Sequence, residues 1–205
     1  MRNIIYILFF MVATLNGQTK MSSAESANLK AKVKAHATTI NTLLNDFTQY
    51  KHLDFLSNDI VTSGQMAFKS PNMVKWEYTT PFKYSVLFKN ETLFINDEGK
   101  KSNVNIGSNK LFKQLNSLII NSIKGDMFDD NEFDIAYFKN EANNEVHFSP
   151  KDKEFSKYIK EFNIIFNEEG HVVELKMIEP SEDYTRIVFN NRSVNTPLSD
   201  AIFAE

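Results

Sequence analysis

The fold of this chain is decided by residues 46–81, which read DFTQYKHLDFLSNDIVTSGQMAFKSPNMVKWEYTTP. Near the end of this stretch, Val74, Trp76 and Tyr78 alternate with Lys75 and Glu77, so apolar and polar side chains occupy opposite faces of a strand. Further along, Asn90-Glu91 and Asp97-Glu98-Gly99 indicate turns on either side of residues 92–96. A period of two that is interrupted by turns predicts a meander of antiparallel strands.

The same period continues through the rest of the chain. Tyr84, Val86 and Phe88 share one strand face, although Leu87 between them breaks the alternation. The C-terminal tail, residues 195–205, carries apolar side chains that can dock as a last strand or turn. Further strands, bounded by turn residues, are expected at 92–96, 133–138, 145–148, 162–166, 172–178 and 184–189.

Two segments have the period of a helix instead. Ser22 and Glu25 have the spacing of a capping box. The first helix is expected to continue through an apolar stripe of Leu29, Val33, Ala37, Ile40 and Leu44. Ser108 is expected to cap the second helix, which ends at Gly125 and whose stripe is Leu111, Leu115, Leu118 and Ile119.

Two helices are too few to cover this many strands as a flat sheet. The chain also has 18 Phe, seven Tyr and one Trp, and that aromatic surface has to face something apolar. A strongly curved sheet solves both problems, as a barrel or half-barrel of about 10–11 strands with helices closing its mouth. Composition leaves open whether such an interior is filled by its own side chains or holds a cavity.

The N-terminus indicates export. Arg2 precedes an apolar run at residues 4–15 that is too short to span a bilayer, and Gly17 suits cleavage, so residues 1–17 are predicted to be a signal peptide. A membrane anchor is the alternative. Residues 18–205 suit a single domain. The chain has no cysteine, so it offers no site for the acyl groups of a lipoprotein and no disulfide.

Charge and site chemistry favour neither nucleic acid nor catalysis. The formal net charge is −3 at pH 7, and loss of Arg2 with the signal peptide makes it slightly more negative. We expect no metal, because an acidic group lacks the spacing of a calcium loop: Asp126, Asp129, Asp130, Glu132 and Asp134. We expect no catalytic residue or cofactor, because the histidines are scattered: His36, His52, His147 and His171.

A family resemblance adds to these inferences. The anchors along the first stretch are Phe47-Thr48-Gln49, Ser63-Gly64, Phe68, Pro71-Asn72, Trp76-x-Tyr78 and Pro81. This order resembles the start of the periplasmic carriers of outer-membrane lipoproteins, the LolA-type family. Phe148-Ser149-Pro150, Gly170 and residues 185–191 resemble the same family, so the likeness extends over nearly all of residues 18–205 and is weakest at 100–132.

The resemblance implies a mainly β fold with some α, an incomplete antiparallel barrel with an α-helical lid over an apolar cavity. It implies transport without covalent chemistry. The carrier would take acylated lipoproteins from an inner-membrane ABC-type release complex, shield their acyl chains across the periplasm and pass them to an outer-membrane acceptor. We expect it to act as a monomer.

The resemblance and strand parity together suggest which residues form the site. Trp76 matches the strand Trp of the family, and the remaining cavity residues follow from parity. The expected lining of the acyl-chain cavity is Phe47, Phe68, Val74, Trp76, Tyr78, Val86 and Phe88, and the expected lid residues are Leu111, Leu115 and Ile119. The best-known members have an Arg before Pro-Asn, which hydrogen-bonds to the lid and holds it shut. This chain has Ser70 there, and a serine hydroxyl cannot replace the several N–H donors of a guanidinium group.

Two other functions remain open at this point. The same barrel could sense lipid or lipoprotein, or carry another lipid or apolar product, because an apolar cavity does not specify its cargo. A hydrolase is the less favoured alternative.

Overall fold

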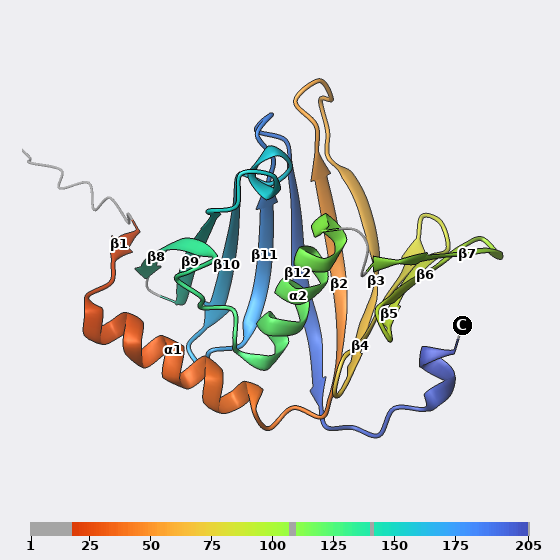
Figure 1. The fold of residues 1–205 in the computed structure, drawn as a ribbon, viewed down its shortest axis with the longest axis horizontal. Coiled ribbons are helices and arrows are strands. Elements are labelled where there is room, and N and C mark those ends of the chain that lie inside the picture. Colours follow the sequence, from red (N-terminus) through yellow and green to blue (C-terminus); the bar gives the residue numbers. More distant parts are fainter. Residues whose placement is uncertain (1–17, 107–109, 140–141, 205) are drawn as a thin grey trace, which may run out of the picture.

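The structure is a computed structural model that describes residues 18–106, 110–139 and 142–204 (Figure 1). The expected signal peptide and the expected cap at Ser108 lie outside these residues. The strands are β1 (Thr19–Lys20), β2 (Thr42–His52), β3 (Ile60–Lys69), β4 (Met73–Thr80), β5 (Tyr84–Lys89), β6 (Thr92–Asp97), β7 (Lys100–Asn105), β8 (Phe133–Lys139), β9 (Asn143–Pro150), β10 (Glu161–Asn167), β11 (Val172–Ile178) and β12 (Tyr184–Val194). The helices are α1 (Ser23–Ala37), α2 (Lys110–Lys124) and two short 3-10 helices, η2 (Phe155–Lys157) and η3 (Asp200–Phe203).

All described strands belong to one antiparallel sheet. Their order is β1-β8-β9-β10-β11-β12-β2-β3-β4-β5-β6-β7, and β1 and β7 at its two ends are not paired with each other. Figure 1 shows the sheet curving around α2, with α1 running across the lower ends of β9 to β11. The expected mainly β fold, an incomplete antiparallel barrel with a helical cover, is therefore confirmed. The 12 described strands slightly exceed the expected number.

The strands that the alternation did not predict are the two at the sheet ends. Every residue of β7 is exposed, so its sequence carries no apolar period. It forms because Glu98 and Gly99 have positive φ values of 48° and 95°, the backbone conformation of a tight hairpin turn. The turn folds Lys100–Asn105 back onto β6. An edge strand built by a turn in this way cannot be found from hydrophobicity.

The break in alternation at Leu87 has a structural cause on the outer face of the sheet. Leu87 is buried there in a small cluster with Ala67 and Phe203. Phe203 belongs to η3, which the C-terminal tail lays against this face, and it is only 2% exposed. The expected docking of the tail as a turn is confirmed. Leu87 is apolar because the tail covers it.

Helix α1 begins as expected and ends earlier than expected. The Ser22 hydroxyl accepts a hydrogen bond from the Glu25 amide at 3.3 Å, and the Glu25 carboxylate accepts one from the Ser22 amide at 2.9 Å. The helix ends at Ala37, so the expectation that Ile40 and Leu44 continue its stripe is wrong: Ile40 follows the helix and Leu44 lies in β2. Thr38 and Thr39 follow the last turn, and their hydroxyls donate to the carbonyls of Ala35 and His36. Such β-branched, self-bonding residues favour leaving the helix.

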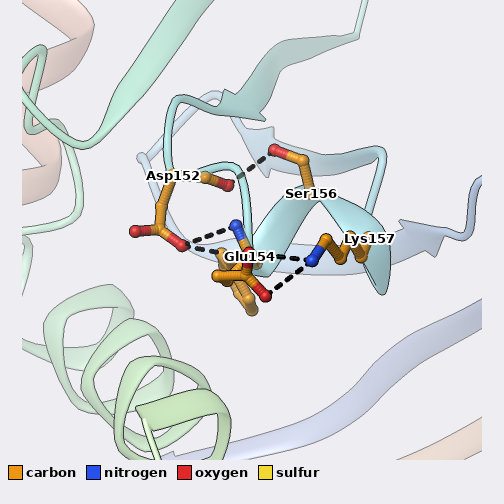
Figure 2. Close-up of polar contacts among 5 residues, drawn as sticks. Asp152, Glu154, Ser156 and Lys157 are labelled. Atoms are coloured by element: carbon orange, nitrogen blue, oxygen red, sulfur yellow. Dashed lines mark hydrogen bonds and ion pairs between the residues drawn. The ribbon is translucent and has the colours of Figure 1, made fainter.

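The connection between β9 and β10 is held by polar contacts among its own residues (Figure 2). The Asp152 carboxylate accepts hydrogen bonds from the amides of Glu154 and Phe155 at 3.1 and 2.9 Å. The Ser156 hydroxyl donates to the Asp152 carbonyl at 2.8 Å. Lys157 pairs with Glu154 at 2.8 Å. These contacts form η2 and bury Phe155, which is 3% exposed, under the sheet.

Candidate apolar binding site

The structure brings all seven expected lining residues into one apolar cluster. We call it the α2 cluster, because α2 contributes to it and strands β2 to β6 supply most of the rest. Its buried members are Leu43, Phe47, Met66, Phe68, Val74, Phe88, Leu93, Ile106 and Ile120. Its partly buried members are Ile40, Trp76, Tyr78, Val86, Ile95, Ile119, Ile123, Ile187 and Phe189.

Strand register explains why these side chains share a face. Val74 lies opposite Phe88 and Trp76 lies opposite Val86 across β4 and β5. On the other side of β4, Val74 lies opposite Phe68. Residues directly opposite in an antiparallel pair point to the same side of the sheet. The parity used at the sequence level therefore places the seven residues together, and whether they line an acyl-chain site remains a prediction.

Gly64 allows β3 and β4 to approach closely beside this cluster. It lies opposite Phe47 on β2 and Tyr78 on β4, next to a register shift at residues 63–64. A Cβ at this position would be 1.9 Å from the Glu77 carbonyl oxygen, so only glycine fits. The Ser-Gly anchor of the sequence is thus a point of close strand approach.

Three aromatic rings form the wall of the cluster around Phe47. The centroid of the Phe47 ring is 5.1 Å from Trp76 and 5.1 Å from Tyr78, with interplanar angles of 66° and 81°. Phe189 of β12 extends the wall, 6.0 Å from Trp76. Edge-to-face contacts of this kind favour aromatic packing. The wall is therefore a preformed apolar surface.

The base of this cluster is packed by the protein's own side chains. Val74 is 0% exposed and Phe68 is 1% exposed, and Ile119, Ile120 and Ile123 of α2 pack into the cluster. The described residues also line two hollows of about 340 and 460 Å³. The first lies on the outer face beside Leu87, and the second lies at the rim and touches the expected lining through Tyr78.

Two polar groups lie within the aromatic wall and differ in their hydrogen bonding. The Tyr78 hydroxyl donates to the Gln49 amide oxygen at 3.0 Å, and burial raises the pKa of Tyr78. The Trp76 indole nitrogen Nε1 is buried and has no hydrogen-bond partner among the residues that the structure describes. Sequence reasoning did not single out Gln49 for this role.

The family of the chain follows from a sequence comparison. The family model described as "Outer membrane lipoprotein carrier protein LolA" matches residues 38–205. The chain belongs to the LolA family. A search of curated proteins finds no match.

Solved structures similar to this LolA-family chain are distant in sequence. A DUF1329 family protein from Desulfovibrio piger is 13% identical, with 88% of this chain and 96% of that chain covered and a TM-score of 0.49. A LolA superfamily protein from Nitrosomonas europaea is 9% identical, with 90% and 99% covered and a TM-score of 0.45. The lipoprotein LppX of Mycobacterium tuberculosis is 9% identical, with 84% and 98% covered and a TM-score of 0.49. Membership of the LolA family rests on the sequence match.

At the position of the LolA-type latch, the structure shows a different contact. Ser70 is exposed, and its amide donates to the Asn41 carbonyl at 2.8 Å. Two residues later, the Asn72 side-chain oxygen accepts a hydrogen bond from Lys124 Nζ at 2.8 Å. Lys124 is the last residue of α2. The β3–β4 turn therefore contacts α2 through a donor on the helix and an acceptor on the turn.

The lid residues are described only in part. Ile119 packs into the α2 cluster as expected. Leu111 and Leu115 belong to the α2 backbone, but their side chains lie outside what the structure describes. Sequence reasoning missed Phe189 and Ile187, although their alternation along β12 was visible, and it missed Leu43, which shares parity with Phe47.

Two negative findings concern the described part of this LolA-family chain. Within that part, no group of three or more His, Asp or Glu side chains is placed to hold a metal ion. No described helix has the length and hydropathy needed to cross a membrane.

Proposed function

We propose that this protein is a periplasmic carrier that shields the acyl chains of lipoproteins in the α2 cluster. It receives acylated lipoproteins from an inner-membrane ABC-type release complex and passes them to an outer-membrane acceptor. It binds and releases its cargo without covalent chemistry. Membership of the LolA family supports the cargo class, and the half-buried apolar cluster under a single helix supports the site.

An acyl chain requires an extensive apolar surface. Burying each CH₂ contributes about 0.8 kcal/mol, so a chain of about sixteen carbons gains on the order of 12 kcal/mol on leaving water. Ile119, Ile120 and Ile123 now occupy the concave surface of the sheet. When α2 moves outward, an acyl chain takes over their contacts, and the apolar faces that α2 exposes can cover it.

Exchange of one apolar partner for another also explains release. The α2 isoleucines and an acyl chain compete for the same wall. The chain therefore gains an apolar environment, but its net affinity for the carrier is lowered by the free energy needed to displace α2. A cargo bound at its full transfer free energy would leave too slowly for transport. The packing of the α2 isoleucines in the cluster is therefore a part of the proposed mechanism.

A charge on the inner face of β5 tests this function. Purified protein starting at residue 18 is mixed with a triacylated lipoprotein in detergent-free buffer, and complexes are counted by native mass spectrometry. The wild type is expected to form a one-to-one complex. Val86→Lys places a charge in the cluster and should abolish it, because burying an unpaired ammonium is strongly unfavourable.

The matched control is the adjacent residue. Ser85 lies on the outer face of the same strand, opposite Glu77, so Ser85→Lys adds the same charge beside a carboxylate. It should bind the lipoprotein normally. Circular dichroism checks that both variants keep their sheet. Equal binding by folded Val86→Lys and Ser85→Lys proteins would refute the site.

A further inference from the structure

In the aromatic wall of Phe47, Trp76, Tyr78 and Phe189, the Trp76 indole N–H is the polar group that has no hydrogen-bond partner among the described residues. Trp76 lies on β4, opposite Met66 on β3 and Val86 on β5. Its ring packs against Phe47 and Phe189. These four neighbours are apolar, and one strand further, opposite Met66, the buried Asn45 has a side-chain oxygen that is likewise unpaired among the described residues. The Nε1 atom is buried without a hydrogen-bond partner among the described residues.

An unpaired buried donor is an exception that needs a cause. Native structures satisfy the large majority of buried polar side-chain atoms, because an unpaired one loses its bonds to water and gains nothing. Two residues along the same strand face, the Tyr78 hydroxyl is satisfied by Gln49 at 3.0 Å. The protein thus supplies a partner for one polar group on this wall and leaves the other unpaired.

The chemistry of the indole limits what can pair with it. An indole N–H only donates, so its partner has to be an acceptor. Among apolar neighbours the acceptor should be neutral, because a bare anion would be costly to desolvate there. An acyl chain reaches such a site with one neutral acceptor at its head, the carbonyl oxygen of its ester or amide.

We propose that Trp76 Nε1–H donates a hydrogen bond to the carbonyl oxygen of an acyl ester or amide bound in the α2 cluster. This inference rests on the proposed function and adds the ligand group that the site recognises. The wall then distinguishes an acyl group from a hydrocarbon or ether of equal length. It also fixes where along β4 the head of the chain lies, so the tail extends into the part of the cluster around Val74 and Phe68.

A matched pair of lipids tests the hydrogen bond. 1-Monopalmitoylglycerol has an ester carbonyl, and 1-O-hexadecylglycerol is the same molecule with an ether in its place. Titration calorimetry below the micelle concentration gives both affinities. For the wild type we expect the ester to bind about fivefold more tightly, the size of one net hydrogen bond. In Trp76→Phe, which keeps an aromatic ring without the N–H, the ratio should fall to about one.

Tyr78→Phe is the control, because it removes a wall hydroxyl that already has its partner in Gln49. It should keep the fivefold ester preference even if it unfolds more easily. The ratio within one variant is insensitive to a general loss of packing. The chain has one Trp, so its fluorescence provides a second readout in the wild type: ester binding should shift the emission more than ether binding.

Each outcome decides the proposal. Loss of the ester preference in Trp76→Phe, with retention in Tyr78→Phe, supports it. A wild type that binds both lipids equally, or a Trp76→Phe protein that still prefers the ester, overturns the hydrogen bond and leaves the carrier function standing. If neither lipid binds, and the lipoprotein complex is also absent, the proposed function fails together with this inference.

Discussion

The concave face of the sheet has two halves that are built differently. Under α1, the strands β8 to β11 surround a cluster whose described members are mostly fully buried, among them Met127, Phe148 and Phe166 at 0–1% exposure. We call it the α1 cluster. Under α2, half of the described apolar members are only partly buried, including Trp76 and Phe189. The α1 cluster is the more fully buried of the two, and α2 contributes to both, because its Leu118 is a buried member of the α1 cluster.

Polar contacts tie both helices to the residues beneath them. In helix α1, Lys32 donates to the Glu168 carbonyl at 2.6 Å, and ion pairs join Lys30 to Asp130, Lys34 to Asp126 and Glu25 to Lys139. At the end of α2, Lys124 donates to Asn72. Burial is therefore what separates the two halves, and because half of the described members of the α2 cluster are only partly buried, we expect α2 to be the helix that moves.

The largest expected effect contrasts two phenylalanines. Phe148→Ala in the α1 cluster should cost about 3–5 kcal/mol of unfolding free energy, because the ring is fully buried. Phe189→Ala in the α2 cluster should cost about 1–2 kcal/mol, because its ring is partly exposed. Urea unfolding measures both.

Lipid binding should rank the same two variants in the opposite order. Folded Phe148→Ala protein should bind monopalmitoylglycerol as the wild type does, whereas Phe189→Ala should bind it about tenfold more weakly through lost apolar contact. If Phe148→Ala lowered the affinity more than Phe189→Ala did, the division of the interior into a core and a site would be wrong.

A smaller effect is expected at the end of the cover. Lys124→Met keeps the apolar stem and removes the hydrogen bond to Asn72, so the acyl chain should leave about two- to fivefold faster. Stopped-flow transfer of a fluorescent acyl chain to vesicles measures the rate. The control is Lys30→Met on α1, which removes an ion pair to Asp130 at 3.7 Å and should leave the release rate unchanged. Equal rates for wild type and Lys124→Met would show that this contact does not hold the cover.

The smallest expected effect is a pH dependence on the α1 side. The hydrogen bond from Lys139, with the amide and hydroxyl of Ser22, lowers the pKa of Glu25 from 4.5 to about 2. A carboxyl whose pKa is lowered by folding stabilises the folded state above pH 4.5, and this contribution is lost as the pH falls toward 2. Thermal unfolding should therefore show a small stability difference between wild type and Glu25→Gln at neutral pH that shrinks across this window. A constant difference between pH 7 and pH 2 would contradict the account.

Much of the candidate site was predictable, because strand parity depends on local sequence. The alternation through Val74, Trp76 and Tyr78 placed all seven expected lining residues in one cluster. The end of α1 was not predictable from its stripe, because Leu44 fits a helical spacing by coincidence and pairing with β3 and β12 places it in a strand. The contact of Lys124 with Asn72 joins segments far apart in the sequence, and only tertiary packing brings them together.

The central claim is that acyl chains bind under α2 and not in the α1 cluster. Photo-cross-linking tests it most directly, with a monopalmitoylglycerol that carries a diazirine at the middle of its chain, followed by peptide mass spectrometry. The account predicts labels on β4, β5 and β12, near Val74, Val86 and Phe189. Labels concentrated on β9 and β10, near Phe148 and Phe166, or spread over the outer face, would contradict it.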